Sequence, residues 1–255
     1  MSIQQQKLFN VLVIGDDCLD VYQYGTVERL SPEAPVPVFK ASHSVELPGM
    51  AGNVRRNLEA LGCTTAFLSN TYSRKTRLID AKSKQHIVRI DEDHQASTPL
   101  EIVTKIPSVY DAIVVSDYNK GTVSTGLIQE LRAEFDGPIF VDTKKRELHH
   151  FEGCFVKINQ HEHDLLQTKC SDIIVTCGED GVRYKDNFWT SINVDVSDVT
   201  GAGDTFLAAL AFEYLQTGSI CQSVPFAIKA STITVQHVGV YAPTLEEINA
   251  VKWNG

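Results

Sequence analysis

Short runs of apolar, mostly β-branched residues recur along the chain, with stretches of helical length between them. The runs lie at residues 11–15, 65–69, 112–116, 138–142, 154–158 and 172–176. They are apolar along most of their length, which is typical of parallel strands buried on both faces. Helix-length segments, such as residues 53–61 and 124–135, stand between them. The pattern predicts an α/β fold with a doubly wound, mostly parallel sheet and helices on both faces.

Two segments depart from this pattern. Residues 21–47 surround a proline-rich stretch, and residues 76–91 look like a hairpin that turns near residues 81–84. We expect both to form antiparallel strands in a small β flap, or lid, over the carboxyl ends of the main strands, where open α/β sheets bind ligands. An edge extension of the main sheet is the alternative. No linker or repeat interrupts residues 1–255, so we expect a single domain.

Composition narrows the class of protein. With 43% hydrophobic and 22% charged residues among 255, the chain is typical of a soluble globular protein, and its net charge of -9 argues against a nucleic-acid partner. No apolar stretch reaches the length of a membrane span, and residues 1–7 lead into a strand, unlike a signal peptide. Six scattered cysteines indicate reduced thiols. We expect a cytoplasmic protein with no membrane partner.

The segment from Asp198 to Thr205 is the strongest candidate for chemistry, because it precedes an apolar helical stretch at residues 206–215. A turn made of Gly201, Ala202 and Gly203 would open that helix, and its free amide groups would stabilise a phosphate. Asp204 would then accept a proton from an attacking hydroxyl. The alternative is that Asp204 only caps the helix and the glycines only allow close packing.

This segment resembles the signature of the ribokinase-like (PfkB) carbohydrate kinases, and other family motifs follow in the same order. Residues 15–20 resemble the motif whose final aspartate, here Asp20, binds sugar hydroxyls. Residues 48–53 look like the turn that contacts the sugar through Gly49 and Asn53, although Met50 stands where the family has its second glycine. The resemblance implies a sugar site on this side of Asp204.

On the nucleotide side, residues 159–162 are similar to the family's Asn-x-x-Glu motif near the metal and phosphates, which would be Asn159 and Glu162. Residues 176–181 match the nucleotide loop, and residues 227–237 read as a helix beside the nucleotide that ends before a turn. The positions concerned are Thr176, Gly178, Gly181 and Gly239. The resemblance implies ATP as co-substrate and Mg²⁺, held mainly by the nucleotide with Glu162 acting through water.

Residues 31–38, 75–77, 88–91 and 116–121 resemble, more narrowly, the kinases that phosphorylate heptose 7-phosphate in ADP-heptose synthesis. That resemblance implies transfer to the anomeric hydroxyl of a sugar already phosphorylated at its far end, and a homodimer formed through the flap. The expected substrate-binding residues in or beside these segments are Arg77, Arg89, Asp117, Lys120 and Lys144. A lone lysine or arginine can instead be a solvated surface charge.

Several features depart from the family or stay open. After residues 69–70 the chain lacks about one helix and strand that relatives carry, and we expect the missing unit to lie at a sheet edge. The histidines at 149, 150, 161 and 163 have no spacing that completes a metal site, so we expect them to be solvated or locally hydrogen-bonded. Asp198 is expected to hold the loop; the alternative places it in a monovalent-cation site.

The motifs, with the resemblance they carry, thus imply an ATP-dependent phosphotransferase that acts on a sugar or sugar phosphate. Two alternatives remain at this stage. One is a PfkB kinase of another sugar or a nucleoside. The other is a non-catalytic protein that binds a sugar or nucleotide in the same pocket, and the intact segment from Gly201 to Asp204 argues against it, because a binding protein needs no base.

Overall fold

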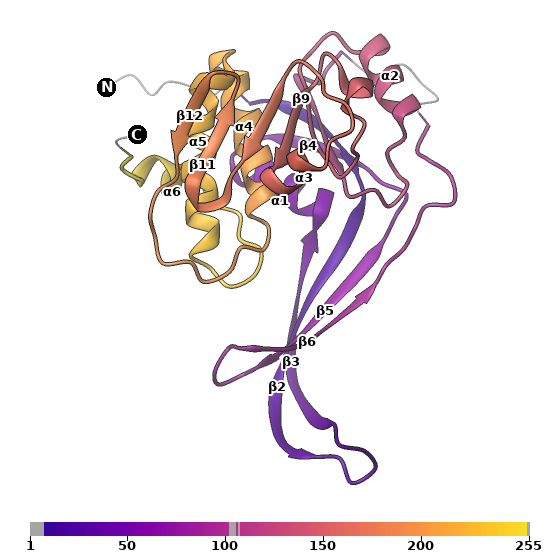
Figure 1. The fold of residues 1–255 in the computed structure, drawn as a ribbon, viewed down its shortest axis with the longest axis vertical. Coiled ribbons are helices and arrows are strands. Elements are labelled where there is room, and N and C mark those ends of the chain that lie inside the picture. Colours follow the sequence, from indigo (N-terminus) through magenta and orange to yellow (C-terminus); the bar gives the residue numbers. More distant parts are fainter. Residues whose placement is uncertain (1–7, 102–105, 107, 254–255) are drawn as a thin grey trace.

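The chain folds around two β-sheets, which a computed structural model describes for residues 8–101, 106 and 108–253 (Figure 1). The larger, eight-stranded sheet has the order β12-β11-β10-β9-β8-β7-β1-β4. Its strands are β1 (Asn10–Gly15), β4 (Thr64–Leu68), β7 (Ala112–Asp117), β8 (Ile139–Thr143), β9 (Phe155–Asn159), β10 (Ile173–Thr176), β11 (Gly181–Tyr184) and β12 (Asn187–Thr190). All pairings from β4 to β10 are parallel, which confirms the predicted sheet.

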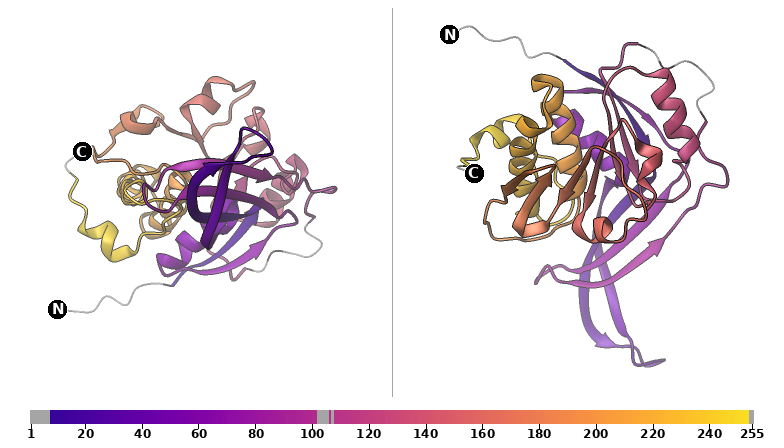
Figure 2. Two further views of the ribbon diagram at one scale, coloured as in Figure 1. Left: turned by 90° about the horizontal axis from the view of Figure 1, so that it is seen from below. Right: turned by 45° about the horizontal axis from the view of Figure 1, so that its top comes forward.

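Helices cover both faces of this sheet (Figure 2). Val11 and Val13 of β1 pack in a core with helices α1, α4 and α5, whereas Leu12 and Ile14 pack in a second core with α2. This alternation explains why the strand is apolar throughout. The helices are α1 (Met50–Ala60), α2 (Thr125–Glu134), α3 (Gln160–Asp164), α4 (Ala202–Thr217), α5 (Ile220–Val235) and α6 (Leu245–Ala250), with 3₁₀ turns η1 (Leu148–Phe151) and η2 (Gly178–Asp180).

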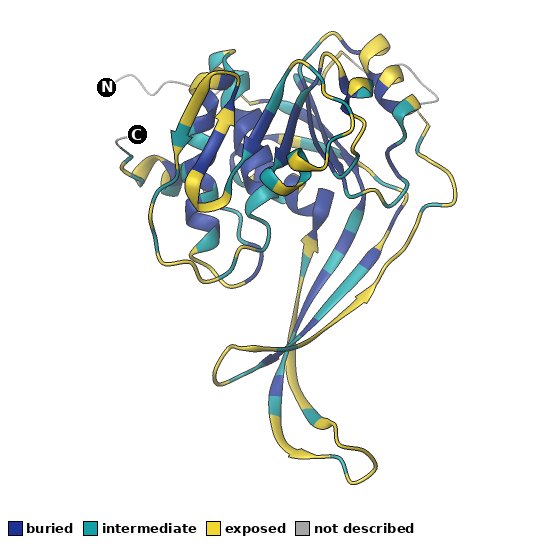
Figure 3. Cartoon of the chain, viewed as in Figure 1, coloured by how far each residue is buried: buried dark blue, intermediate teal, exposed yellow. Residues whose placement is uncertain are grey.

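The smaller sheet is the predicted flap, and it projects from the body as a long arm (Figure 1). It has the order β3-β2-β5-β6, formed by β2 (Asp17–Leu30), β3 (Pro37–Gly49), β5 (Ser73–Asp80) and β6 (His86–Glu92). Its outer half is mostly exposed (Figure 3). The two hairpins are antiparallel, but the central pair of β2 and β5 is parallel. This differs from the expected antiparallel flap because both strands leave the body in the same direction.

Two further features bear on the predictions. Strand β4 forms one edge of the large sheet, and the chain passes from it to β5 through residues 69–72. Strands β11 and β12, which the sequence pattern did not reveal, are antiparallel and four residues long. Residues 1–7, expected to lead into the first strand, lie outside the described residues. In the part of the chain that is described, helices are too short or too polar to cross a membrane.

Candidate active site

The carboxylate of Asp204 lies in the first turn of α4 and is almost completely buried, with 4% exposure. Its Oδ2 accepts a hydrogen bond from Asn53 Nδ2 at 2.9 Å, and its Oδ1 accepts one from the Tyr118 hydroxyl at 2.9 Å. Burial raises the pKa of Asp204 to about 6, and these two hydrogen bonds only partly oppose that rise. The group is therefore ionised at neutral pH yet close to its proton-binding range, which suits a general base.

The turn before Asp204 has the expected shape. Gly201 precedes the helix with φ of 79°, a left-handed conformation that favours glycine. The Ala202 N–H donates to Val199 O at 3.3 Å, so this amide, expected to face a phosphate, is held in the turn instead. The following amides lack acceptors within the helix, as in any first helical turn. Any contact of a phosphate with this turn would therefore involve the amides after Ala202 and not Ala202 itself.

A lysine that the motifs did not reveal lies beside this turn. A Cβ built on Gly203 would come within 2.8 Å of Lys157 Nζ, so the glycine leaves room for the ammonium group. Lys157 is buried in β9 and forms an ion pair with Asp142 at 2.7 Å. The sequence could have revealed Lys157 as a single charged residue inside a mostly apolar strand, because a lysine is rarely buried unless it is paired with an opposite charge.

On the sugar side, Asp20 and Arg77 form a buried ion pair, with Arg77 Nη1 2.5 Å from Asp20 Oδ1. The guanidinium also lies over the ring of Tyr22, 5.1 Å from its centroid. A Cβ on Gly49 would approach Asp20 Oδ2 to 2.2 Å, so only glycine leaves space for this carboxylate. Arg77 was expected to hold a substrate phosphate, but its guanidinium group is paired with the carboxylate of Asp20.

The next turn contains a non-glycine residue in a left-handed conformation. Met50, which stands in place of a glycine, has φ of 48°, a left-handed value that is strained for a residue with a side chain. Helix α1 starts there and carries Asn53, which is fully buried and reaches Asp204. Asn53 therefore contacts Asp204 even though Met50 stands where a glycine was expected.

Three of the other expected substrate-binding residues are committed to protein partners. Asp117 is buried and accepts hydrogen bonds from Thr143 Oγ1, Lys145 Nζ and the Asn119 N–H. Lys120 forms an ion pair with Asp93 at 2.6 Å, and Arg89 is exposed and pairs with Asp91. Asp117 thus stabilises the loop after β7, and the structure does not bring these three side chains to Asp204.

Lys144, in contrast, lies near Glu162, which was expected to act on the metal ion, and near Tyr118, which contacts Asp204. Its ammonium group pairs with Glu162 and lies 5.3 Å from the ring centroid of Tyr118. The carboxylate of Glu162 also accepts the Asn159 N–H at 2.8 Å, while Asn159 Oδ1 accepts the Glu162 N–H, a capping box that starts α3. Each oxygen of Glu162 thus has one protein partner, and both partners hold this side chain at the start of α3.

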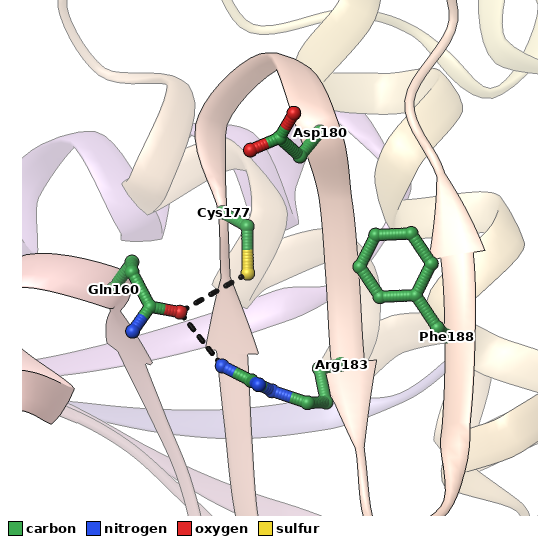
Figure 4. Close-up of a pocket in the computed structure, with 5 residues that line it drawn as sticks. All are labelled: Gln160, Cys177, Asp180, Arg183 and Phe188. Carbon is green, nitrogen blue, oxygen red and sulfur yellow. Dashed lines mark hydrogen bonds between the residues drawn. The ribbon is translucent and has the colours of Figure 1, made fainter.

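The nucleotide-loop residues lie beside Asn159, because Thr176 is its register partner between β9 and β10. Gly178 and Gly181 have φ of 60° and 130°, and a Cβ on Gly181 would meet Trp189 O at 1.9 Å. A neighbouring pocket of about 500 Å³ is lined by Gln160, Cys177, Asp180, Arg183 and Phe188 (Figure 4). Within it, Gln160 Oε1 accepts hydrogen bonds from Arg183 at 2.7 Å and from Cys177 at 3.5 Å.

Asp198 holds the loop before the helix, in agreement with the favoured interpretation. Its Oδ1 accepts from the N–H and hydroxyl of Thr200, and its Oδ2 accepts from the Gly239 N–H at 2.9 Å. Burial raises the pKa of Asp198, but these hydrogen bonds outweigh burial and lower it overall. Gly239 in turn lies against Tyr22, since a Cβ there would be 2.9 Å from its ring. Gly239 therefore joins the flap to this loop.

Metal-ligand chemistry is limited in the described residues. They contain no group of three or more His, Cys, Asp or Glu arranged to hold a metal ion, and the rings of His149 and His150 contact each other. Within the same residues, Asp142 Oδ1 is buried without a hydrogen-bond partner, 3.8 Å from Lys144 Nζ. A single available carboxylate oxygen fits Mg²⁺ that is held mainly by nucleotide oxygens.

Comparison with known proteins adds independent evidence. Residues 148–248 match the family model described as pfkB family carbohydrate kinase. The bifunctional protein HldE of a Nitratiruptor species is 29% identical over 93% of this chain, and that of Hyphomonas neptunium is 30% identical over 94%. The chain spans 64% and 63% of the lengths of these curated relatives. The first alignment covers 299 positions, so the relative has internal residues that this 255-residue chain lacks.

Solved structures with similar folds are more distant in sequence. Phosphofructokinase-2 from Escherichia coli, in complex with substrates and products, has a TM-score of 0.70 at 16% identity, with 95% of this chain and 97% of that chain covered. Ribokinase from Thermotoga maritima has a TM-score of 0.67 at 17% identity, with 96% and 99% covered. These likenesses show that the fold is ribokinase-like.

Proposed function

We propose that this chain, which carries a PfkB carbohydrate kinase domain, transfers the γ-phosphate of ATP to a hydroxyl group of a sugar or sugar phosphate. The observation that carries this proposal is the buried carboxylate of Asp204 in the first turn of α4, held between Asn53 and Tyr118. The positive end of the helix and the amides that follow Ala202 would stabilise charge on the transferring phosphoryl group, next to the group that takes the proton.

In this mechanism Asp204 accepts the proton of the attacking hydroxyl while Asp20 and Asn53 orient the sugar. Arg77 balances the charge of Asp20 in its buried position, because a buried charge without a partner is costly. Mg²⁺ would neutralise phosphate charge, with Asp142 as the carboxylate that can contact it directly and Glu162 acting through water. Lys144 and Lys157 add fixed positive charge beside the helix start.

The finer proposal is that the acceptor is the anomeric hydroxyl of a heptose 7-phosphate-like sugar. The likeness to the HldE proteins over most of the chain supports it. A phosphorylated substrate also needs fixed cations on a protein of net charge -9, and Lys75 and Lys144 flank Tyr118 next to Asp204. A PfkB kinase of another sugar or of a nucleoside is the alternative function.

We also propose a homodimer that forms through the flap. Apolar side chains on the flap are exposed by 37% to 64%, a pattern that marks interaction surfaces. They are Val27, Leu30, Val36, Val45, Val88 and Ile90. The cytoplasm, where ATP is abundant, is the proposed location.

The test measures ATP consumption against a panel of sugars, sugar phosphates and nucleosides. We expect turnover with a phosphorylated sugar, and Asp204→Asn should lower kcat by at least about 10²-fold while ATP affinity stays within about twofold, because only the proton acceptor is lost. Cys221→Ser, on the exposed start of α5, serves as the control variant. Turnover of Asp204→Asn at the wild-type rate would exclude Asp204 as the base.

A further inference from the structure

Tyr118 contacts the proposed base directly, yet no motif assigned it a role. Its hydroxyl donates to Asp204 Oδ1 at 2.9 Å, while Asn53 occupies Oδ2. Each carboxylate oxygen accepts two hydrogen bonds, so a substrate hydroxyl can bind Asp204 without displacing either partner. Tyr118 and the substrate can therefore contact the same carboxylate at once.

The loop that carries Tyr118 is fixed by a buried carboxylate. Asp16 is fully buried, and its oxygens accept the N–H groups of Tyr118, Lys120 and Thr122 at 2.8 to 3.1 Å. The residue in between, Asn119, has φ of 57°, a strained conformation that persists only where the surroundings enforce it. The backbone of Tyr118 is thus held in one position before any substrate arrives.

The ring of Tyr118 is fixed as well, because two ammonium groups lie near it. Lys75 Nζ, from flap strand β5, is 5.8 Å from the ring centroid, and Lys144 Nζ, from the loop after β8, is 5.3 Å away. Cations at this distance are attracted to an aromatic ring. Tyr118 therefore connects the flap, the body and Asp204.

We infer that Tyr118 is a positioning residue, which holds the Asp204 carboxylate ready to accept the proton of the acceptor hydroxyl. The inference rests on the proposed function of Asp204 as base. A phenol suits this task because it donates one strong hydrogen bond, and because its high pKa, raised further by burial, keeps that proton on the tyrosine.

The test compares wild type with Tyr118→Phe, which removes the hydroxyl and keeps the ring near both lysines. The pKa of Asp204 is followed by ¹³C NMR of protein labelled at the aspartate carboxyl carbons, with the signal assigned by its absence in Asp204→Asn. We expect the pKa to rise by about one unit, the effect of one hydrogen bond to a charged group. Thermal unfolding reports whether the variant is folded.

Tyr184→Phe is the matched control, because it also removes a tyrosine–aspartate hydrogen bond. That bond joins the Tyr184 hydroxyl, on β11, to Asp172 at 2.6 Å and involves neither Tyr118 nor Asp204. This variant should leave the Asp204 titration unchanged. In the kinase assay, Tyr118→Phe should lower kcat about fivefold at pH 6 and little at pH 8, with the KM for ATP unchanged.

The outcomes separate the inference from the proposed function. An Asp204 signal that titrates at the same pH in wild type and folded Tyr118→Phe would overturn the role of Tyr118, whatever the activity. A shifted titration in a protein that phosphorylates no compound of the panel would support the role of Tyr118 and refute the kinase proposal instead.

Discussion

Asp204→Asn is expected to stabilise the folded protein at neutral pH, even though it should abolish turnover. Burial raises the pKa of Asp204 from 3.8 to about 6, so the folded state pays for keeping this side chain ionised. A shift of roughly two units corresponds to about 3 kcal/mol as an upper limit. Asparagine avoids this cost and still accepts the Asn53 hydrogen bond, but it weakens the contact with Tyr118 by about 1 kcal/mol. The expected net gain is about 2 kcal/mol.

The pH dependence distinguishes this effect from ordinary repacking. Because the folded-state pKa is raised, wild type loses stability as pH increases from about 4 to about 6, and the loss is complete above that range. Urea unfolding of both proteins between pH 4 and 8 measures the difference in free energy of unfolding. Near pH 4 the variant should be up to about 1 kcal/mol less stable than wild type, because only the weakened Tyr118 contact counts there, and by about pH 7 it should be about 2 kcal/mol more stable. An asparagine variant that is less stable at pH 7.5, or a difference that is constant with pH, would refute the reasoning.

Two other predictions concern the buried pair and the turn glycines. Arg77→Met should lower the free energy of unfolding, measured in urea, by about 3–5 kcal/mol, because Asp20 is left as an unpaired buried charge. The double variant with Asp20→Leu should recover most of this lost stability. Gly201→Ala should lower the free energy of unfolding by about 1–2 kcal/mol or more because of its positive φ. Gly203→Ala, where the nearest atom to a new Cβ is Lys157 Nζ and not a backbone atom, should lower kcat with a smaller loss of stability. Equal stability losses in the two glycine variants would contradict this difference.

The main sheet was predictable because its strands are buried on both faces. Val11, Leu12, Val13 and Ile14 alternate between two helical layers, and such residues leave an uninterrupted apolar run in the sequence. Strands β11 and β12 were missed because they are four residues long and β12 is mostly exposed, so neither leaves a long apolar run in the sequence. The parallel pairing of β2 with β5 depends on contacts between distant segments, which local patterns do not encode.

For the candidate site, the sequence indicated the residues of the motifs but not their partners. Asp204 and Asn53 come together as the motifs implied. The ion pair between Arg77 and Asp20 could not be deduced, because the sequence around a lone arginine in a strand does not show whether the side chain faces a phosphate or a carboxylate. Tyr118 likewise looks like one residue of a matching segment until the fold places its hydroxyl against Asp204.

The flap is joined to the body without flexible connections at its first hairpin. Strand β2 follows β1 after a single residue, Asp16, and β3 continues directly into α1 at Met50. When such an arm bends, its atoms move most at the free tip and least at the root, where the strands join the body. Asp20 and Gly49 lie near that root, on paired strands. Bending of the arm would therefore move the tip, while Asp20, the carboxylate proposed to orient the sugar, would keep its position.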